Sequence, residues 1–149
     1  MIATIIDCPV TPEIERVLLA CSGACSECDC RAGEIGCAIR FDGLVRRLES
    51  TGEIDQPEGR ALRPLVGLVY EAYEPMASRE FASLAQSIAR EFSLAAISAI
   101  HSRGLVKVGE VSFVLIVEAS HRREGIAAVQ AFIDRLKCDV PIWKNPVWA

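Results

Sequence analysis

With 149 residues, 51% of them hydrophobic, the chain has the size of one domain and enough apolar side chains for a substantial core. Its net charge of -4 argues against a general nucleic-acid binder, because such domains usually present a wide positive surface. No window approaches the ~20 apolar residues of a membrane-spanning helix, and the first six residues lack the basic leader of a signal peptide. We therefore expect a cytoplasmic protein without a nucleic-acid or membrane partner.

The first elements are a short strand and a capped helix. Residues 2–6 are apolar or β-branched, which predicts a strand. Thr11, Pro12 and Glu13 then supply a hydroxyl cap, a proline at the first helical position and an acid in the first turn. The helical period predicts four buried side chains, those of Ile14, Val17, Leu18 and Cys21.

Four of the seven cysteines lie close together, at Cys21, Cys25, Cys28 and Cys30. A disulfide framework is not expected, because the cytoplasm keeps thiols reduced. The thiols can continue the apolar stripe of the helix as small hydrophobic side chains. Alternatively, their spacing can gather several thiolates around zinc or an iron–sulfur cluster. We predict reduced side chains and no cofactor, with metal binding as the alternative.

Strands and helices follow without strict alternation. Gly36–Arg46 predicts a strand that runs into a glycine-marked bend, and residues 49–64, rich in Gly, Pro and charge, predict a mobile surface loop. Leu65–Tyr73 and Ile97–His101 predict two more strands. Between them, Met76 begins an amphipathic helix. Its predicted buried face consists of Phe81, Leu84, Ala85, Ile88 and Phe92.

The last third of the chain contains the clearest pattern. Gly104 and Gly109 bracket a short extended piece. Val111–Ala119 is almost continuously apolar and β-branched, which predicts a strand buried on at least one face. A helix follows until Pro141 ends it, with apolar residues at Ile126, Val129, Phe132, Ile133 and Leu136. The short turns between strands predict an α+β fold with a mostly antiparallel sheet.

Basic residues mark the two ends of this strand-helix-loop unit. His121 and Arg122 stand where the strand ends, Lys137 lies in the last helical turn, and Lys144 lies just beyond it. One interpretation is a solvated basic rim, in which Lys137 complements the dipole at the helix C-terminus. The other is a set of converging cations. His101, with no partner at metal-ligand spacing, is assigned a structural role.

Several motifs resemble the large, catalytic subunit of molybdopterin synthase. They are F-x-G-x-V-R at residues 41–46, Y-E-A-Y-E-P-M-A from Tyr70, H-R at His121, I-D-R-L-K ending at Lys137, and V-P-I-W-K ending at Lys144. The similarity runs from about Gly36 to Trp143. We expect one domain over residues 1–149, with a divergent cysteine-rich part at 1–35. The resemblance implies an α/β hammerhead type of fold.

The resemblance also implies an activity in molybdenum cofactor biosynthesis. Enzymes of this family are sulfurtransferases that pass sulfur from the thiocarboxylated C-terminus of a small ubiquitin-like subunit to cyclic pyranopterin monophosphate, which yields molybdopterin. The large subunit forms a homodimer within a heterotetramer and binds no molybdenum. Lys137 and Lys144 are the implied catalytic residues. The implied substrate-binding residues are Phe41, Leu44, Val45, Arg46, His121, Arg122, Lys137, Lys144, Asn145 and Pro146.

The chemistry of these side chains fits that activity. A phosphate and a thiocarboxylate must be held together despite their repulsion, so several cations should converge. Arg46 and Arg122 suit bidentate contact with oxyanions. Lys137, partly buried among positive neighbours, suits acid/base chemistry, and we expect it in one pocket with His121 and Lys144.

Two other classes of function stay open. One is a non-catalytic relative that keeps the tail-binding groove as an interaction module, and the other is a metal-binding protein that uses the cysteines. The two lysines favour the enzyme. In contrast, the short tail favours the module. Asn145 and Pro146 are a further departure, because they stand where the family usually has a second basic residue and a glutamate.

Overall fold

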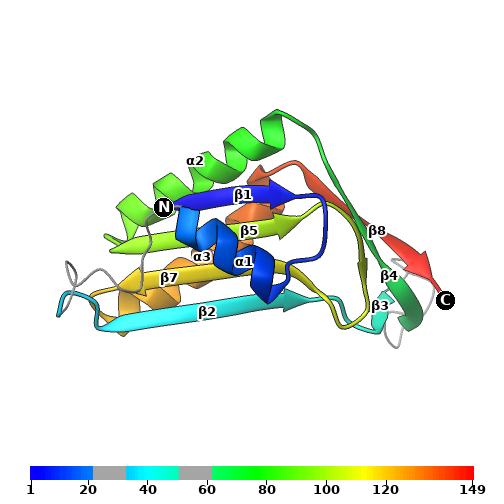
Figure 1. Ribbon diagram of the computed structural model, residues 1–149, viewed down its shortest axis with the longest axis horizontal. Coiled ribbons are helices and arrows are strands. Elements are labelled where there is room, and N and C mark those ends of the chain that lie inside the picture. The colour runs from blue at the N-terminus through cyan, green and yellow to red at the C-terminus, as the bar shows by residue number, and fades with distance from the viewer. Residues whose placement is uncertain (22–32, 51–61) are drawn as a thin grey trace, which may run out of the picture.

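The computed structural model describes residues 1–21, 33–50 and 62–149 (Figure 1). The elements in chain order are β1 (Ile2–Ile6), α1 (Pro12–Cys21), β2 (Cys37–Leu44), β3 (Leu48–Ser50), β4 (Leu62–Ala72), α2 (Met76–Glu91), β5 (Ala96–Ser102), β6 (Gly104–Lys107), β7 (Val111–Ala119), α3 (Arg122–Asp139) and β8 (Ile142–Trp148). None of the helices in these described ranges is both long and apolar enough to cross a bilayer.

The larger sheet has the strand order β1-β5-β7-β2 and is covered by helices on both faces (Figure 1). Successive side chains of a strand point to opposite faces. Accordingly, Phe113, Leu115 and Val117 of β7 pack in the cluster formed with α2 and α3. Val114 and Ile116 pack in the cluster on the α1 side. This two-sided burial is the reason why β7 is almost continuously apolar.

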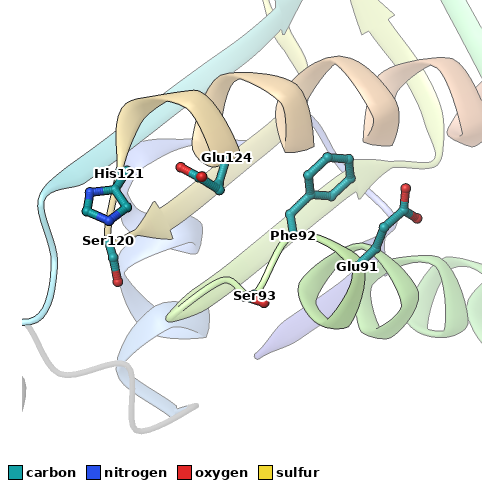
Figure 2. Close-up of a pocket in the computed structure, with 6 residues that line it drawn as sticks. All are labelled: Glu91, Phe92, Ser93, Ser120, His121 and Glu124. Atoms are coloured by element: carbon teal, nitrogen blue, oxygen red, sulfur yellow. The ribbon is translucent and has the colours of Figure 1, made fainter.

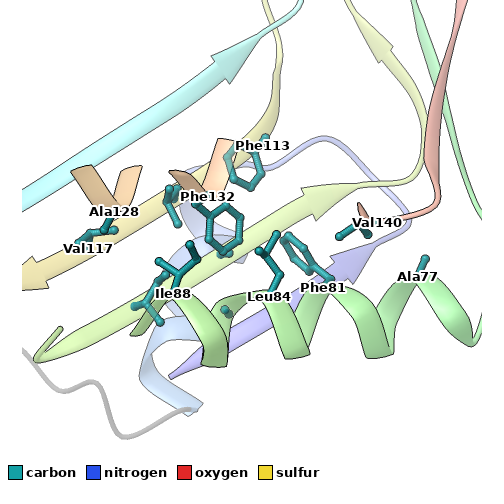
Figure 3. Close-up of a cluster of buried hydrophobic side chains, with 13 residues drawn as sticks. Ala77, Phe81, Leu84, Ile88, Phe113, Val117, Ala128, Phe132 and Val140 are labelled. Carbon is teal, nitrogen blue, oxygen red and sulfur yellow. The ribbon is translucent and has the colours of Figure 1, made fainter. Parts of the chain in front are cut away.

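The main core lies between this sheet and the α2–α3 layer (Figure 3). Three phenylalanines form its centre. The ring centroids of Phe81 and Phe132 are 5.9 Å apart, and those of Phe113 and Phe132 are 6.0 Å apart. Such edge-to-face and offset arrangements are favourable beyond the apolar area that they bury. Phe132 thereby ties α3 to both the sheet and α2.

The smaller sheet is built around β4. Residues 67–70 of β4 pair with β6 and also with β8, while β3 pairs with the first residues of β4. The chain enters this sheet from β5 through Arg103 and Gly104, whose φ of 89° is in the region that favours glycine. Gly67 meets a second constraint, because a Cβ there would lie 2.5 Å from the carbonyl oxygen of Val106.

The predicted fold class is confirmed. In the described part of the chain only the β1–β5 ladder is parallel, and the other ladders are antiparallel. The predicted strand over residues 111–119 is confirmed at both ends. The predicted loop over 49–64 is wrong at its ends, because 49–50 belong to β3 and 62–64 to β4. Its residues 51–61 lie outside the described residues. β8 was not predicted.

One helix face also differs from prediction, because Val17, predicted to be buried, is 58% exposed. On α3, Ile126 is 60% exposed although it shares the helical spacing of the apolar residues. The buried stripe of α3 contains small residues instead: Gly125 approaches β2 so closely that a Cβ would lie 3.2 Å from Ile39 Cδ1. Among the α1 side chains that the structure describes, residues 12–18, Glu15 is the buried one, and Arg40 of β2 neutralises its charge in an ion pair.

Candidate functional site

Two of the predicted site residues, Arg46 and Lys144, meet at one carboxylate. Lys144 Nζ lies 3.1 Å from Glu49 Oε1, and Arg46 Nη2 lies 3.5 Å from the same oxygen. Arg46 follows β2, Glu49 is in β3, and Lys144 is in β8. The structure therefore places two cations where one anionic oxygen can contact both. We call these three residues the Arg46–Glu49–Lys144 cluster.

The backbone beside Arg46 is held firmly. The Val45 N–H donates to the Glu110 carbonyl at 3.1 Å, and the Val45 carbonyl accepts from the Gly109 N–H at 2.9 Å. The Val45 side chain is 3% exposed and packs in the core cluster of the smaller sheet. The side chain thus anchors the strand end, and the contact of Val45 with substrate stays a prediction. The Arg46 side chain, 75% exposed, projects from this anchored backbone.

Lys144 is positioned by the ladder between β8 and β4, in which it lies opposite Tyr70. Side chains of directly opposite residues share one face of a sheet. The Tyr70 hydroxyl donates to Ser112 Oγ at 3.1 Å, and that hydroxyl donates to the Gly43 carbonyl at 3.0 Å. Burial raises the pKa of Tyr70, the hydrogen bond with Ser112 opposes this, and the charge of Glu49 adds to it. Tyr70 is thus a neutral hydrogen-bond donor in the strand position opposite Lys144.

Lys137 lies in the last turn of α3, as predicted. The helix ends at Asp139, the buried Val140 follows, and β8 begins at Ile142. Lys137 and Lys144 consequently stand on the two sides of one short connection. Lys137 is exposed, so its expected partial burial among positive neighbours is wrong within a single chain.

His121 and Arg122 occupy the opposite end of α3. His121 is the N-cap residue and Arg122 the first helical residue, and both are exposed. His121 lines a pocket of about 310 Å³ together with Glu91, Phe92, Ser93, Ser120 and Glu124 (Figure 2). Two carboxylates in this pocket disfavour an anionic ligand there. Glu91 is partly compensated, because Arg135 donates to it at 2.7 and 2.9 Å.

The expected convergence of His121, Lys137 and Lys144 in one pocket is wrong within one chain. An α-helix rises ~1.5 Å per residue, so α3 separates His121 from Lys137 by roughly 24 Å. The helix returns over its own strand without bringing its two ends together. The candidate residues therefore lie at three places: Arg46 and Lys144 meet at Glu49, Lys137 lies in the last turn of α3, and His121 and Arg122 lie at the N-terminus of α3.

The remaining predicted contact residues are on the surface of the strands. Phe41 of β2 is partly exposed and lies 6.2 Å from the Phe113 ring, and Leu44 at the end of β2 is exposed. Asn145 and Pro146 are exposed residues of β8, next to Lys144. All four are accessible to a ligand.

His101 has the structural role that was predicted. It is buried, its Nδ1 lies 2.8 Å from the Ser102 carbonyl oxygen, and its ring lies 5.1 Å from that of Tyr70 and 5.7 Å from that of Phe113. Burial lowers the pKa of His101, although the hydrogen bond to Ser102 opposes the shift. The ring is therefore an uncharged member of the core.

The cysteine prediction is tested only in part. Cys8, Cys37 and Cys138 are free thiols. Within residues 1–21, 33–50 and 62–149 no three potential ligand side chains gather as a metal site. The side chains of Cys21, Cys25, Cys28 and Cys30 lie outside the described part of the structure, so their state stays a prediction.

The fold and the Arg46–Glu49–Lys144 cluster define an α+β protein with a candidate surface site for an anion. Solved structures with this fold include molybdopterin synthase from Staphylococcus aureus, with a TM-score of 0.72 and 24% identity over 99% of this chain and 91% of that one. A complex of subunits 1 and 2 of molybdopterin-converting factor from Helicobacter pylori has a TM-score of 0.64 and 22% identity, and the match covers 98% of this chain and 88% of that one. At such identities these likenesses show the fold.

Sequence relatives agree with the structural ones. The molybdopterin synthase catalytic subunit of Nostoc sp. is 36% identical over 76% of this chain and 62% of its own length, and that of Arabidopsis thaliana 35% over 78% and 54%. The human catalytic subunit is 37% identical over 58% and 46%. The matches thus span about half to three fifths of these relatives. Residues 21–139 match the model of the MoaE protein family, and the chain belongs to that family.

Sequence reasoning missed Glu49 and Tyr70 as members of the site. Glu49 was assigned to a loop, and no local pattern pairs it with Arg46, because charge pairs three residues apart are a rule for helices and Glu49 lies in β3. Tyr70 belongs to a recognised motif, but its position opposite Lys144 depends on β8, which was not predicted.

Proposed function

We propose that this protein is the catalytic subunit of a molybdopterin synthase. It would transfer sulfur from the thiocarboxylated C-terminus of a small ubiquitin-like subunit to cyclic pyranopterin monophosphate. The observation that carries the proposal is the pair of cations, Arg46 and Lys144, held around one oxygen position. Lys137 lies in the last helical turn before the strand that bears Lys144. Membership of the MoaE family supports it.

The site chemistry matches the two anions of this reaction. A phosphate and a thiocarboxylate repel each other, and the approach of one to the other needs fixed positive charge. Arg46 can bind two oxygens of one group, because its guanidinium is planar, whereas Lys144 acts as a point charge. Lys137 would contact the reacting acyl group and move a proton. Phe41 and Leu44 offer apolar contact to the incoming tail.

His121 and Arg122 can serve the same substrate only from a second copy of the chain, since α3 keeps them roughly 24 Å from Lys137. The proposal therefore includes a homodimer with two sites. In each site, Arg46, Lys137 and Lys144 come from one copy, and His121 and Arg122 come from the other. It also includes the cytoplasm as the place of action, where the free thiols Cys8, Cys37 and Cys138 stay reduced.

The direct test is a turnover assay with thiocarboxylated small subunit and the cyclic pterin, with molybdopterin as the product measured. Lys137→Ala should lower turnover by roughly 10²-fold or more, as when one positioned acid/base or electrostatic group is removed. Lys137→Arg should not restore it, because guanidinium does not exchange a proton near neutral pH. Affinity for the small subunit should change far less. Wild-type turnover by both Lys137→Ala and Lys144→Ala would remove the two lysines from the mechanism. Absence of turnover by the wild-type protein would exclude the proposal and favour an interaction module.

The shared site has its own test, based on mixed dimers. Lys137→Ala and Arg122→Ala proteins should each be nearly inactive alone. If dimers form at random from equal amounts, half are mixed and each mixed dimer has one intact site, so about a quarter of wild-type activity should return. No recovery on mixing the two inactive proteins would show that both residues act within one chain, and activity of either variant alone would show that its residue is dispensable.

A further inference from the structure

Glu49 occupies the position that the two cations of the site offer to an anion. Its Oε1 accepts from Lys144 Nζ at 3.1 Å and from Arg46 Nη2 at 3.5 Å, and its Oε2 also lies 3.5 Å from Arg46 Nη2. Among the described residues, Glu49 is the only acidic partner of either cation. The internal carboxylate thus makes the contacts that a phosphate or thiocarboxylate oxygen would make.

The exposure of the three side chains shows from which side an anion would arrive. The Glu49 side chain is 17% exposed, whereas those of Arg46 and Lys144 are 75% and 54% exposed. The carboxylate therefore lies on the inner side of the cluster, with both cations open to solvent. The effect of the Glu49 charge on the nearby Tyr70 hydroxyl is consistent with this inner position.

Only the Glu49 side chain needs to move to free the cations. Its backbone is held in β3, where Glu49 lies opposite Arg63 of β4. Directly opposite side chains on one face have Cβ atoms roughly 5 Å apart. Arg63, which now stacks on the Trp148 ring at 5.1 Å, can accept the rotated carboxylate as an ion-pair partner. The displaced charge then meets a cation.

We infer that Glu49 is an internal competitor for the anionic substrate, so that an anion reaches Arg46 and Lys144 only by displacing this carboxylate. The inference deepens the proposed function, on which it rests for the identity of the anion. Glu49 then determines specificity: a singly charged anion gains little by replacing a carboxylate of equal charge. A phosphate, or a phosphate with a thiocarboxylate, brings more charge to the same two cations.

The size of the effect follows from competition. When the competent state is only a fraction of the population, the apparent Kd is raised by the inverse of that fraction. Two solvent-exposed ion pairs together favour the closed state by a modest factor, so removal of the Glu49 charge should tighten anion binding roughly 3- to 10-fold. A carboxylate that merely oriented the two cations would have the opposite effect, because its loss would weaken binding.

The experiment is calorimetric titration of the full chain with inorganic pyrophosphate at low salt, for wild type, Glu49→Gln and Glu71→Gln. Glutamine keeps the shape of the side chain. Glu71 is the matched control, because it is an exposed carboxylate of β4 next to Tyr70 and points to the opposite face. Glu49→Gln should bind roughly 3- to 10-fold tighter and Glu71→Gln within about 2-fold of wild type. Adding Lys144→Ala to Glu49→Gln should abolish the gain.

Several results would overturn the inference. They are unchanged or weaker binding by Glu49→Gln, an equal gain in Glu71→Gln, a gain that survives Lys144→Ala, and an absence of pyrophosphate binding by both wild type and Glu49→Gln. Because the titration involves no turnover, its outcome is separate from that of the synthase assay. Tighter pyrophosphate binding by Glu49→Gln without any molybdopterin formation by the wild type would support the inference and reject the proposed enzyme. Molybdopterin formation without tighter binding would support the enzyme and reject the inference.

Discussion

Phe132→Ala should remove a large part of the stability of this protein. The ring is fully buried at the centre of the main core, in contact with Phe81 and Phe113. A buried aromatic side chain hides roughly 150–250 Å² from water, and at ~25 cal/mol/Å² this sets an upper value of about 4–6 kcal/mol. Alanine keeps part of that area, while the cavity and the lost ring contacts add to the cost. We expect about 4 kcal/mol.

That loss is large compared with the roughly 5–15 kcal/mol by which domains of this size are usually stable. Urea unfolding followed by circular dichroism measures it, with the slope of free energy against urea kept as a check on two-state behaviour. Ile126→Ala is the matched control on the same helix, because its side chain is 60% exposed. It should cost less than about 0.5 kcal/mol. A Phe132→Ala cost below about 1.5 kcal/mol, or an equal cost for Ile126→Ala, would refute this description of the core.

Two further predictions concern folding. Burial lowers the pKa of His101, so the stability that the neutral ring contributes is complete above the unfolded pKa of about 6.5 and is lost as pH falls towards the folded pKa. The melting temperature of the wild type should therefore fall with pH in this range, and that of His101→Phe should fall less. An equal dependence of melting temperature on pH in both proteins would contradict this prediction. Gly67→Ala should cost about 1–3 kcal/mol, because its Cβ would lie 2.5 Å from the Val106 carbonyl and push β6 from β4. A melting temperature equal to that of wild type would show that the strands tolerate a Cβ there.

Local pattern was sufficient for the elements that carry strong periodicity. The apolar run of residues 111–119 is a strand because both of its faces are buried, and the helix before Pro141 ends where the sequence predicts. The predicted separation of strands and helices into an α+β fold followed from these elements and the short turns between them. In contrast, Val17 was predicted to be buried and is 58% exposed, because helical spacing of apolar residues does not by itself select the face that packs on the sheet.

The motifs of the sequence also identified Arg46, Lys137 and Lys144, but not their arrangement. β8 was not predicted, because it contains Pro146 and polar residues before it, and proline is unusual within a sheet. Only pairing with β4 makes this segment a strand. Contact between Glu49 and Lys144, 95 positions apart, depends on that pairing. The separation of His121 from Lys137 was already contained in the length of the predicted helix. Which residues meet across β3, β4 and β8 was decided only by tertiary structure, because hydrogen bonds between distant strands set the register that brings their side chains together.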